Sequence, residues 1–468
     1  MNAPLATAPR PRARSSGHAL AVLCLAQFIV ALDYSIIYVA LPSIGADINF
    51  NPALLQWVVS AYAVLFAGLL LVGGRVADRF GAKRVFIAAI VLFGLASALG
   101  GVATDGTTLL LARGLQGLAA AFLQPSILAL MSAIFVTGAN RAKAVSIWGA
   151  VGASGLTVGV VLGGILTSLS WRWTFLINVP LAALCVVGAM TWFRSHPRHS
   201  GSVRIPFVAA ALGTGALLGT VVTLTLLASA RDSWPILFLV LALTCASIAG
   251  FLIAERVSSN VLITKTLRRI PTLKLGSAAT YLYMASVGSE FYLVTLLLQR
   301  LESFTPLEAG LGFLPLAVLV TVGNIAAGRM VRRFGAGGTL MFGFAISVVG
   351  LGSLALSLGT GNYASSLLPG LILSGFGHGV IYTSMFVIGT RDVPVELQGT
   401  SGALLTTSQY LSAAITVAML TIVLGSNPDA QSFRYAFFVT ALAALVGLVV
   451  GYAAHRHEQA RGSAKAIN

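Results

Sequence analysis

Residues 74–81 read Gly-Arg-Val-Ala-Asp-Arg-Phe-Gly, and residues 328–335 read Gly-Arg-Met-Val-Arg-Arg-Phe-Gly, which is an offset of 254 residues. Each stretch follows a long apolar segment and forms a short basic turn before the next one. The pattern predicts an internal repeat of two parallel six-helix bundles, with two further helices between them. The alternative is that short basic turns recur in membrane proteins without any repeat.

The composition excludes a soluble protein. Of 468 residues, 57% are hydrophobic and 9% are charged, and the mean hydropathy is +0.91, whereas soluble domains carry about 25% charged residues. The 29 Lys and Arg residues are not gathered into one basic face, which argues against nucleic-acid binding. Cys24, Cys185 and Cys245 lie in apolar stretches without metal-ligand spacing. We expect no cofactor and no metal site, and we expect the cysteines to be buried.

Apolar runs long enough to cross a hydrocarbon layer about 30 Å thick predict an all-α integral membrane protein with 14 transmembrane helices. The spans are expected at residues 18–41, 54–77, 84–104, 107–135, 142–168, 172–193, 205–227, 235–255, 272–300, 306–330, 338–359, 363–390, 396–425 and 434–454. The expected units are a tail, a six-helix bundle, a linker with two extra helices, a second six-helix bundle and a second tail, at residues 1–17, 18–193, 194–271, 272–454 and 455–468.

The basic residues predict the orientation. With a cytoplasmic N terminus, 24 of the 29 Lys and Arg residues fall in cytoplasmic segments and 4 in outer loops, with Arg113 inside a span. Cytoplasmic loops of membrane proteins carry such an excess. We therefore expect both termini in the cytoplasm and a multi-pass protein of the inner membrane. The preference for Arg over Lys, with abundant Ala and Gly, favours a bacterial source.

Five motifs resemble the major facilitator superfamily and, more closely, its fourteen-span drug:proton antiporters. Residues 74–84 resemble the loop signature between spans 2 and 3, and residues 32–42 resemble the span 1 signature. The other three motifs are residues 113–117 (R-x-x-Q-G in span 4), the span 5 glycines Gly155, Gly159, Gly163 and Gly164, and residues 171–180 at the start of span 6. The resemblance covers essentially the whole chain and implies proton-coupled transport by alternating access.

The motifs also depart from the family pattern. Ser35 and Tyr38 stand where the span 1 signature has Thr and Asn, and Val160 replaces the span 5 Pro. In the second repeat, Arg332 stands at the position of Asp78, so this motif has an acidic residue only in its first copy.

Asp33, Arg113 and Glu290 are the formally charged residues expected well inside the spans. A charge at a helix centre costs about 2.5–3.5 kcal/mol on insertion scales, so each should face the bundle and be paired. Asp33 and Arg113 have similar depths in spans 1 and 4, which permits an ion pair. We interpret Asp33 as a proton carrier; the alternative is a static salt bridge. Glu290, in the repeat counterpart of span 1, is the second candidate for proton or cation binding, unless it lies solvated in a wide outer vestibule.

Other residues are expected to control the conformation. Asp78 ends span 2, where the helix dipole disfavours an anion, and the resemblance implies a contact with the start of span 13 (396–400) that latches the outward-open state. The alternative is a solvated turn. Glycines spaced by three and four permit close helix packing, and in the family this face is where the halves meet. The predicted gating residues are Gly74, Asp78, Arg79, Gly81, Arg84, Gly155, Gly159 and Gly163.

Aromatic rings beside carboxylates suit flat or lipophilic cations, and this chain has such rings in the spans that line the cavity of this family. They could equally be core or lipid-facing residues. His378 suits a proton relay, although packing is the alternative. The predicted cargo-binding residues are Tyr34, Tyr38, Trp57, Tyr62, Gln116, Trp148, Tyr283, Phe291, His378 and Tyr382.

The sequence lacks the phosphate-loop, H-E-x-x-H and G-x-S-x-G motifs, so neither an ATP-driven pump nor an enzyme is expected. The predicted function is a proton-coupled antiporter that exports lipophilic drugs, antibiotics or a related natural product, cations included. The alternative is an uptake or exchange carrier for a metabolite with the same fold. A receptor or scaffold would leave Asp33 and Arg113 unexplained. We expect a monomer that binds small-molecule cargo, protons and lipid.

Overall fold

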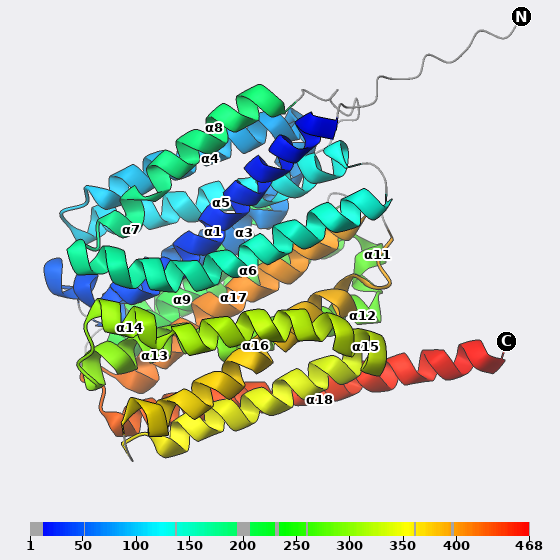
Figure 1. Ribbon diagram of the computed structural model, residues 1–468. Coiled ribbons are helices and arrows are strands. Elements are labelled where there is room, and N and C mark those ends of the chain that lie inside the picture. The colour runs from blue at the N-terminus through cyan, green and yellow to red at the C-terminus, as the bar shows by residue number, and fades with distance from the viewer. Residues whose placement is uncertain are drawn as a thin grey trace, which may run out of the picture.

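The computed structural model describes residues 13–50, 52–135, 138–193, 206–229, 234–258, 261–359, 362–394 and 397–467. All regular structure within these ranges is helical, as predicted. The helices run side by side, and α1 begins and α18 ends at the same end of the molecule (Figure 1). We call this the terminal end and the other the opposite end.

The first half comprises helices α1 to α8. They are α1 (Ala13–Asp47), α2 (Pro52–Leu55), α3 (Trp57–Phe80), α4 (Ala82–Gly101), α5 (Gly106–Ile134), α6 (Gly138–Leu169), α7 (Trp173–Leu176) and α8 (Asn178–Trp192). Asp105 caps α5, since its carboxylate accepts hydrogen bonds from the Thr108 N–H and hydroxyl. These bonds hold the pKa of Asp105 below its usual value.

The second half comprises helices α12 to α18, and α9 to α11 lie between the halves in sequence. The intervening helices are α9 (Phe207–Ser229), α10 (Trp234–Val257) and α11 (Lys265–Arg268). The second half consists of α12 (Pro271–Ala285), η1 (Val287–Ser289), α13 (Glu290–Leu296), η2 (Leu297–Leu301), α14 (Pro306–Gly312), α15 (Leu314–Ser357), η3 (Tyr363–Leu367), α16 (Leu368–Thr390), α17 (Gln398–Leu424) and α18 (Ala430–Ile467).

Twelve helices in the described part of the chain are long and apolar enough to cross a membrane, so the predicted count of fourteen is not confirmed. One of the twelve, Pro306–Ser357, has 52 residues and leaves helical geometry at Gly335. In α6, the described stretch Val158–Leu169 is a shorter apolar helix.

The two repeated basic turns share a backbone conformation. Gly81 and Gly335, which end the two motifs, have positive φ angles of 92° and 75°. Glycine adopts this region without the steric cost that other residues meet. Glu458 of α18 packs against the second turn, and its carboxylate accepts hydrogen bonds from the Gly337 N–H at 3.0 Å and from Arg391. A carboxylate thus lies at the second turn although its own motif has Arg332 in place of an acid.

The helices between the halves in sequence pack on each other and, through α9, on both halves. Helix α9 contacts both α3 and α17, and α10 packs on α9. The Thr225 hydroxyl of α9 accepts hydrogen bonds from Gln56 Nε2 at 2.6 Å and from Trp57 Nε1 at 3.0 Å. Cys24 and Cys185 are buried as predicted, but Cys245 is exposed on α10, because α10 has a helix partner on one side only.

Gly335→Ala should destabilise the protein more than Gly359→Ala does. Both glycines have positive φ, at 75° and 78°, where a side chain costs of order 1–3 kcal/mol. At Gly335 an added Cβ would also lie 2.6 Å from the Glu458 carboxylate, whereas nothing lies within 4 Å at Gly359. Thermal unfolding in detergent measures the difference, and equal midpoints for the two variants would contradict the Glu458 packing.

Candidate functional site

Asp33 lies in the middle of α1 and is buried, with 1% of its surface exposed. Its Oδ2 accepts a hydrogen bond from Arg113 Nη1 of α5 at 2.8 Å. Its Oδ1 accepts hydrogen bonds from Gln116 Nε2 at 2.8 Å and from Asn178 Nδ2 at 2.9 Å. The ion pair that the depths of Asp33 and Arg113 permit is therefore formed.

Arg113 is held from several sides. Its Nε donates to the Val58 carbonyl of α3 at 2.7 Å, and its Nη1 also donates to Gln116 Oε1 at 2.9 Å. The guanidinium lies 4.6 Å from the centre of the Tyr62 ring, an arrangement worth about 2 kcal/mol when desolvated. The planar guanidinium suits this set of partners, whereas a lysine ammonium does not.

Two members of this network were not predicted as site residues. Asn178 begins α8, and Ser97 of α4 accepts a hydrogen bond from Gln116 Nε2 at 2.9 Å. Gln116, one of the predicted cargo-binding residues, donates a hydrogen bond to Asp33. The signal for Asn178 is a buried amide in an apolar span, because such a group must find a hydrogen-bond partner.

Glu290 is fully buried at the start of α13. Its Oε1 accepts a hydrogen bond from Ser374 of α16 at 2.6 Å, and its Oε2 has no partner among the described residues. Burial on all sides does not fit a solvated carboxylate in a wide vestibule. Asp33 and Glu290 thus occupy comparable places, each bonded to a helix of its own half, but within the described residues only Asp33 has a basic partner.

The helix of residues 271–301 is interrupted just before Glu290, and aromatic side chains and a histidine lie around this interruption. Helix α12 ends at Ala285 and α13 begins at Glu290, with η1 between them. The Tyr283 hydroxyl is hydrogen bonded to His378 Nε2, and the Phe291 ring lies 5.7 Å from the His378 ring. Because His378 lies one turn from Ser374 on α16, it faces the same region as Glu290.

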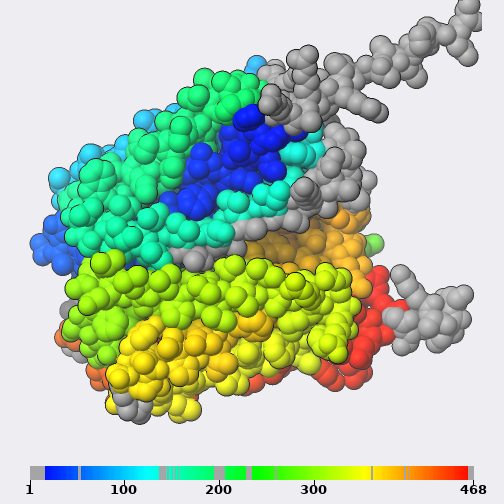
Figure 2. Space-filling model, viewed as in Figure 1, coloured from blue at the N-terminus to red at the C-terminus, as the bar shows by residue number. Residues whose placement is uncertain are grey.

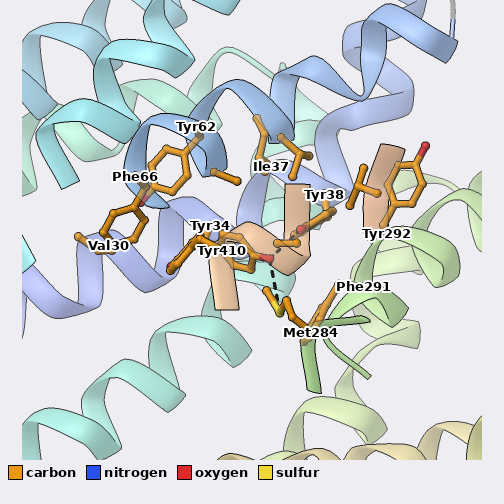
Figure 3. Close-up of a cluster of buried hydrophobic side chains, with 14 of the residues drawn as sticks. Val30, Tyr34, Ile37, Tyr38, Tyr62, Phe66, Met284, Phe291, Tyr292 and Tyr410 are labelled. Atoms are coloured by element: carbon orange, nitrogen blue, oxygen red, sulfur yellow. Dashed lines mark hydrogen bonds between the residues drawn. The ribbon is translucent and has the colours of Figure 1, made fainter. Parts of the chain in front are cut away.

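An aromatic cluster joins the two halves (Figure 3). Its rings come from α1, α3, α13 and α17, and we define it as Tyr34, Tyr38, Tyr62, Phe66, Phe291 and Tyr410. Tyr410 lies 4.2 Å from Phe66 and 5.4 Å from Tyr34, and Tyr38 lies 6.4 Å from Phe291, centre to centre. These rings therefore lie between the halves rather than against lipid.

The remaining predicted cargo residues are dispersed. Trp57 donates a hydrogen bond to Thr225 of α9. Trp148 of α6 is half-buried, and its indole nitrogen has no partner among the described residues. The Tyr382 ring packs at 5.7 Å from that of Tyr283 and at 5.3 Å from that of Phe386.

The predicted gating charges lie at the terminal end. Asp78, Arg79 and Arg84 are exposed there, close to the half-buried Gly74 and Gly81. Glu396, part of the expected contact with Asp78, lies outside the described residues.

The glycines of α6 face two different neighbours. Added Cβ atoms on Gly155, Gly159 and Gly163 would meet α1 of the same half, so these three glycines do not face the second half. A Cβ on Gly164 would lie 2.8 Å from the Pro306 carbonyl oxygen and 3.2 Å from the Gly310 Cα of the second half. Gly164 is thus the member of the motif at which the halves meet, near the opposite end.

A multi-pass helical protein made of two halves, each with a buried carboxylate, has the architecture of a secondary transporter, not of an enzyme. The chain belongs to the Major Facilitator Superfamily, whose family model matches residues 23–417.

Relatives and solved structures agree with this assignment. The chain is 34% identical to the puromycin resistance protein pur8 of Streptomyces alboniger, over 92% of this chain and 86% of the relative. It is 35% identical to the cephamycin export protein CmcT of Amycolatopsis lactamdurans, over 87% and 85% of the two chains. Its fold is similar to a crystal structure of a D-xylose-proton symporter, with a TM-score of 0.67, 14% identity and coverage of 93% and 97%.

Arg113→Leu should destabilise the protein by about 3–5 kcal/mol, because it leaves the Asp33 carboxylate buried without its charge partner. Adding Asp33→Asn should restore part of the loss. The matched control is Arg172→Leu, which breaks the exposed Arg172–Asp47 pair and should cost under about 1 kcal/mol. Unfolding in detergent measures all three, and no recovery in the double variant would contradict the charge-pairing account.

Proposed function

We propose that this protein is a proton-coupled antiporter that exports a small, lipophilic antibiotic or related natural product by alternating access. The main support for this function is the buried Asp33–Arg113 pair, together with the amides of Gln116 and Asn178 that bond Asp33. A carboxyl that can be either paired with a guanidinium or protonated is able to exchange protons with the two sides of a membrane. The relatives named for puromycin resistance and cephamycin export support export over uptake.

In this proposal, proton movement is coupled to export because a proton and Arg113 compete for the Asp33 carboxylate. When a proton binds the carboxylate, Arg113 and the amides of Gln116 and Asn178 lose a charged acceptor. These three donors come from α5 and α8, so protonation loosens contacts between α1 and its neighbours. Each proton that enters carries a charge through the membrane potential, which provides about 2.3 kcal/mol per 100 mV.

Glu290 is the second proton or cation site in this proposal. It is buried, and one of its carboxylate oxygens has no partner among the described residues. A proton or a cationic group on Glu290 would neutralise a charge that is otherwise costly in an apolar interior. His378 and Tyr283 lie beside it and provide a route for that proton towards the terminal end.

We further propose the topology. Two six-helix bundles, at 18–193 and 272–454, flank a linker with α9 and α10, and the total is fourteen spans. The break at Gly335 divides the 52-residue Pro306–Ser357 segment into two arms, and the 32 residues of α6 suffice for one span. The excess of Lys and Arg places both termini in the cytoplasm. The bacterial relatives favour an inner-membrane protein, which we propose acts as a monomer surrounded by lipid.

The conformation corresponds to an inward-facing state in this proposal. Near the opposite end, Gly164 meets Gly310 and Gln299 Nε2 donates to the Val39 carbonyl at 2.9 Å, so the halves are joined there. Towards the terminal end, α17 is visible between α6 and α15 (Figure 2). Asp78, Arg79 and the basic turns would form the cytoplasmic latch when the halves rock to face outward.

Asp33→Asn should abolish export driven by a pH gradient while leaving the protein folded, because Asn cannot exchange a proton but keeps the size of the side chain and one acceptor oxygen. Asp47→Asn is the matched control, since Asp47 is an exposed acid at the C-terminal end of α1, paired with Arg172. Dye transport in inverted membrane vesicles measures both. Full transport by Asp33→Asn would rule out its role as proton carrier.

Glu290→Gln should impair export of cationic dyes more than of neutral drugs, because it removes the buried negative charge. Ser374→Ala is the control, since it removes the hydrogen bond to Glu290 but keeps the charge. Transport of a cationic and a neutral dye by each variant gives the comparison. Equal losses for the two dyes in Glu290→Gln would reject a cation-binding role.

A further inference from the structure

The stretch of chain that enters the second half is tightly bonded rather than slack. We call residues 261–270 the connecting segment; it contains α11, which lies at the terminal end beside α12 (Figure 1). Near the end of α10, Glu255 is buried with 5% of its surface exposed, and the proposed transport chemistry does not use it. A buried acid needs hydrogen-bond donors, and the connecting segment supplies them.

Glu255 fastens the connecting segment to the end of α10. Its Oε1 accepts a hydrogen bond from the Leu262 N–H at 2.6 Å, and its Oε2 accepts from the Ile263 N–H at 3.2 Å and from Arg268. Arg268 also donates to the Glu255 carbonyl at 2.9 Å and to the Ile263 carbonyl at 3.0 Å. Hydrogen bonds to charged groups are stronger than neutral ones, so this set of bonds holds α10 and α11 as one unit.

The connecting segment is also attached to the first half. Arg75 of α3, in the first basic turn, donates a hydrogen bond from Nη2 to the Val261 carbonyl at 3.0 Å. Leu262 is buried in a cluster with Val72 of α3 and Ala210 of α9. As far as Arg268, the chain is therefore bonded to the first half and to the helices that pack on it.

The second half begins almost at once. Leu267 is 1% exposed and belongs to a buried cluster with Leu273 of α12 and Leu405 of α17. Only two residues separate Arg268, the end of α11, from Pro271, the start of α12. Fully extended, this stretch reaches at most about 11 Å. The start of α12 must therefore stay close to the attached segment whenever the halves move.

We propose that the connecting segment is the pivot about which the two halves rock, and that Glu255 and Arg75 are positioning residues that hold this pivot on the first half. Hinges in proteins are a few residues at the ends of elements, as Arg269 and Ile270 are here. The halves then separate at the terminal end away from this corner, while α3 and α12 keep their spacing. The inference rests on the alternating access of the proposed function.

Distances between pairs of nitroxide labels test the pivot directly. Val257→Cys with Lys274→Cys places labels on α10 and α12 across the pivot, and Thr191→Cys with Arg333→Cys places them on α8 and the second basic turn. All four side chains are exposed. The background protein carries serine in place of the native cysteines, Cys24, Cys185 and Cys245.

The labelled proteins are measured in lipid nanodiscs at acidic and alkaline pH, with and without ethidium. We expect the Thr191–Arg333 distance to change by several ångströms between these conditions and the Val257–Lys274 distance to stay the same. Equal changes in both pairs would overturn the pivot and leave the proposed function intact. A change in neither pair would refute the rocking motion and, with it, the proposed function.

Glu255→Gln tests the positioning role, with Arg256→Gln as the matched control because Arg256 is its exposed neighbour on α10. Gln keeps one acceptor oxygen but loses the charge, so its bonds to the connecting segment weaken. We expect a broader Val257–Lys274 distance distribution, and a fall of about tenfold in the Vmax of ethidium export per folded protein with KM unchanged. The control should alter neither quantity. A distribution as narrow as that of the wild type would overturn the role of Glu255.

If Glu255→Gln fails to insert, a longer connection replaces it. Gly-Ser-Gly-Ser is inserted between Arg269 and Ile270, and the same insertion after Asn427, in the exposed turn between α17 and α18, is the control. The first insertion should lower Vmax about tenfold because the halves lose their common pivot, with KM unchanged, and the control should not. Wild-type Vmax in both variants would overturn the proposal, since the connecting segment would then be a slack linker.

Discussion

The pairing of Asp33 with Arg113 is the constraint on which the first half depends. Two opposite charges are buried at one depth, and each would be costly alone in a bilayer. Their remaining hydrogen-bonding capacity is met by Gln116, Asn178 and the Val58 carbonyl, so α1, α3, α5 and α8 are all held to one point. A change of one proton at this point therefore alters contacts of four helices.

The second half repeats the geometry without the same charges. Glu290 bonds α16 through Ser374, as Asp33 bonds α5, but no base accompanies it in the described chain. At the second basic turn, Glu458 of α18 supplies a carboxylate where the motif has Arg332. The two halves thus share the backbone turns at Gly81 and Gly335. They differ in their buried charges: the first half contains the Asp33–Arg113 ion pair, and the second contains Glu290, which has no basic partner among the described residues.

The sequence predicts those features that hydropathy and charge scarcity determine. The helical class, the positions of the long apolar helices and the Asp33–Arg113 pair follow because a buried charge needs a partner. The place of Asn178 and Ser97 could not be predicted, since it depends on how α4 and α8 pack around Gln116. Likewise, helical spacing puts Gly155, Gly159 and Gly163 on one face, but only the packing shows that this face meets α1 and that Gly164 meets the second half.

In the proposed mechanism, Asp33 exchanges its ion pair with Arg113 for a proton during transport. Purified protein in weakly buffered detergent solution, with a pH indicator, reports protons released when a transported dye is added. We expect release by the wild type and none by Asp33→Asn when the dye still binds. Equal release from both proteins would contradict it.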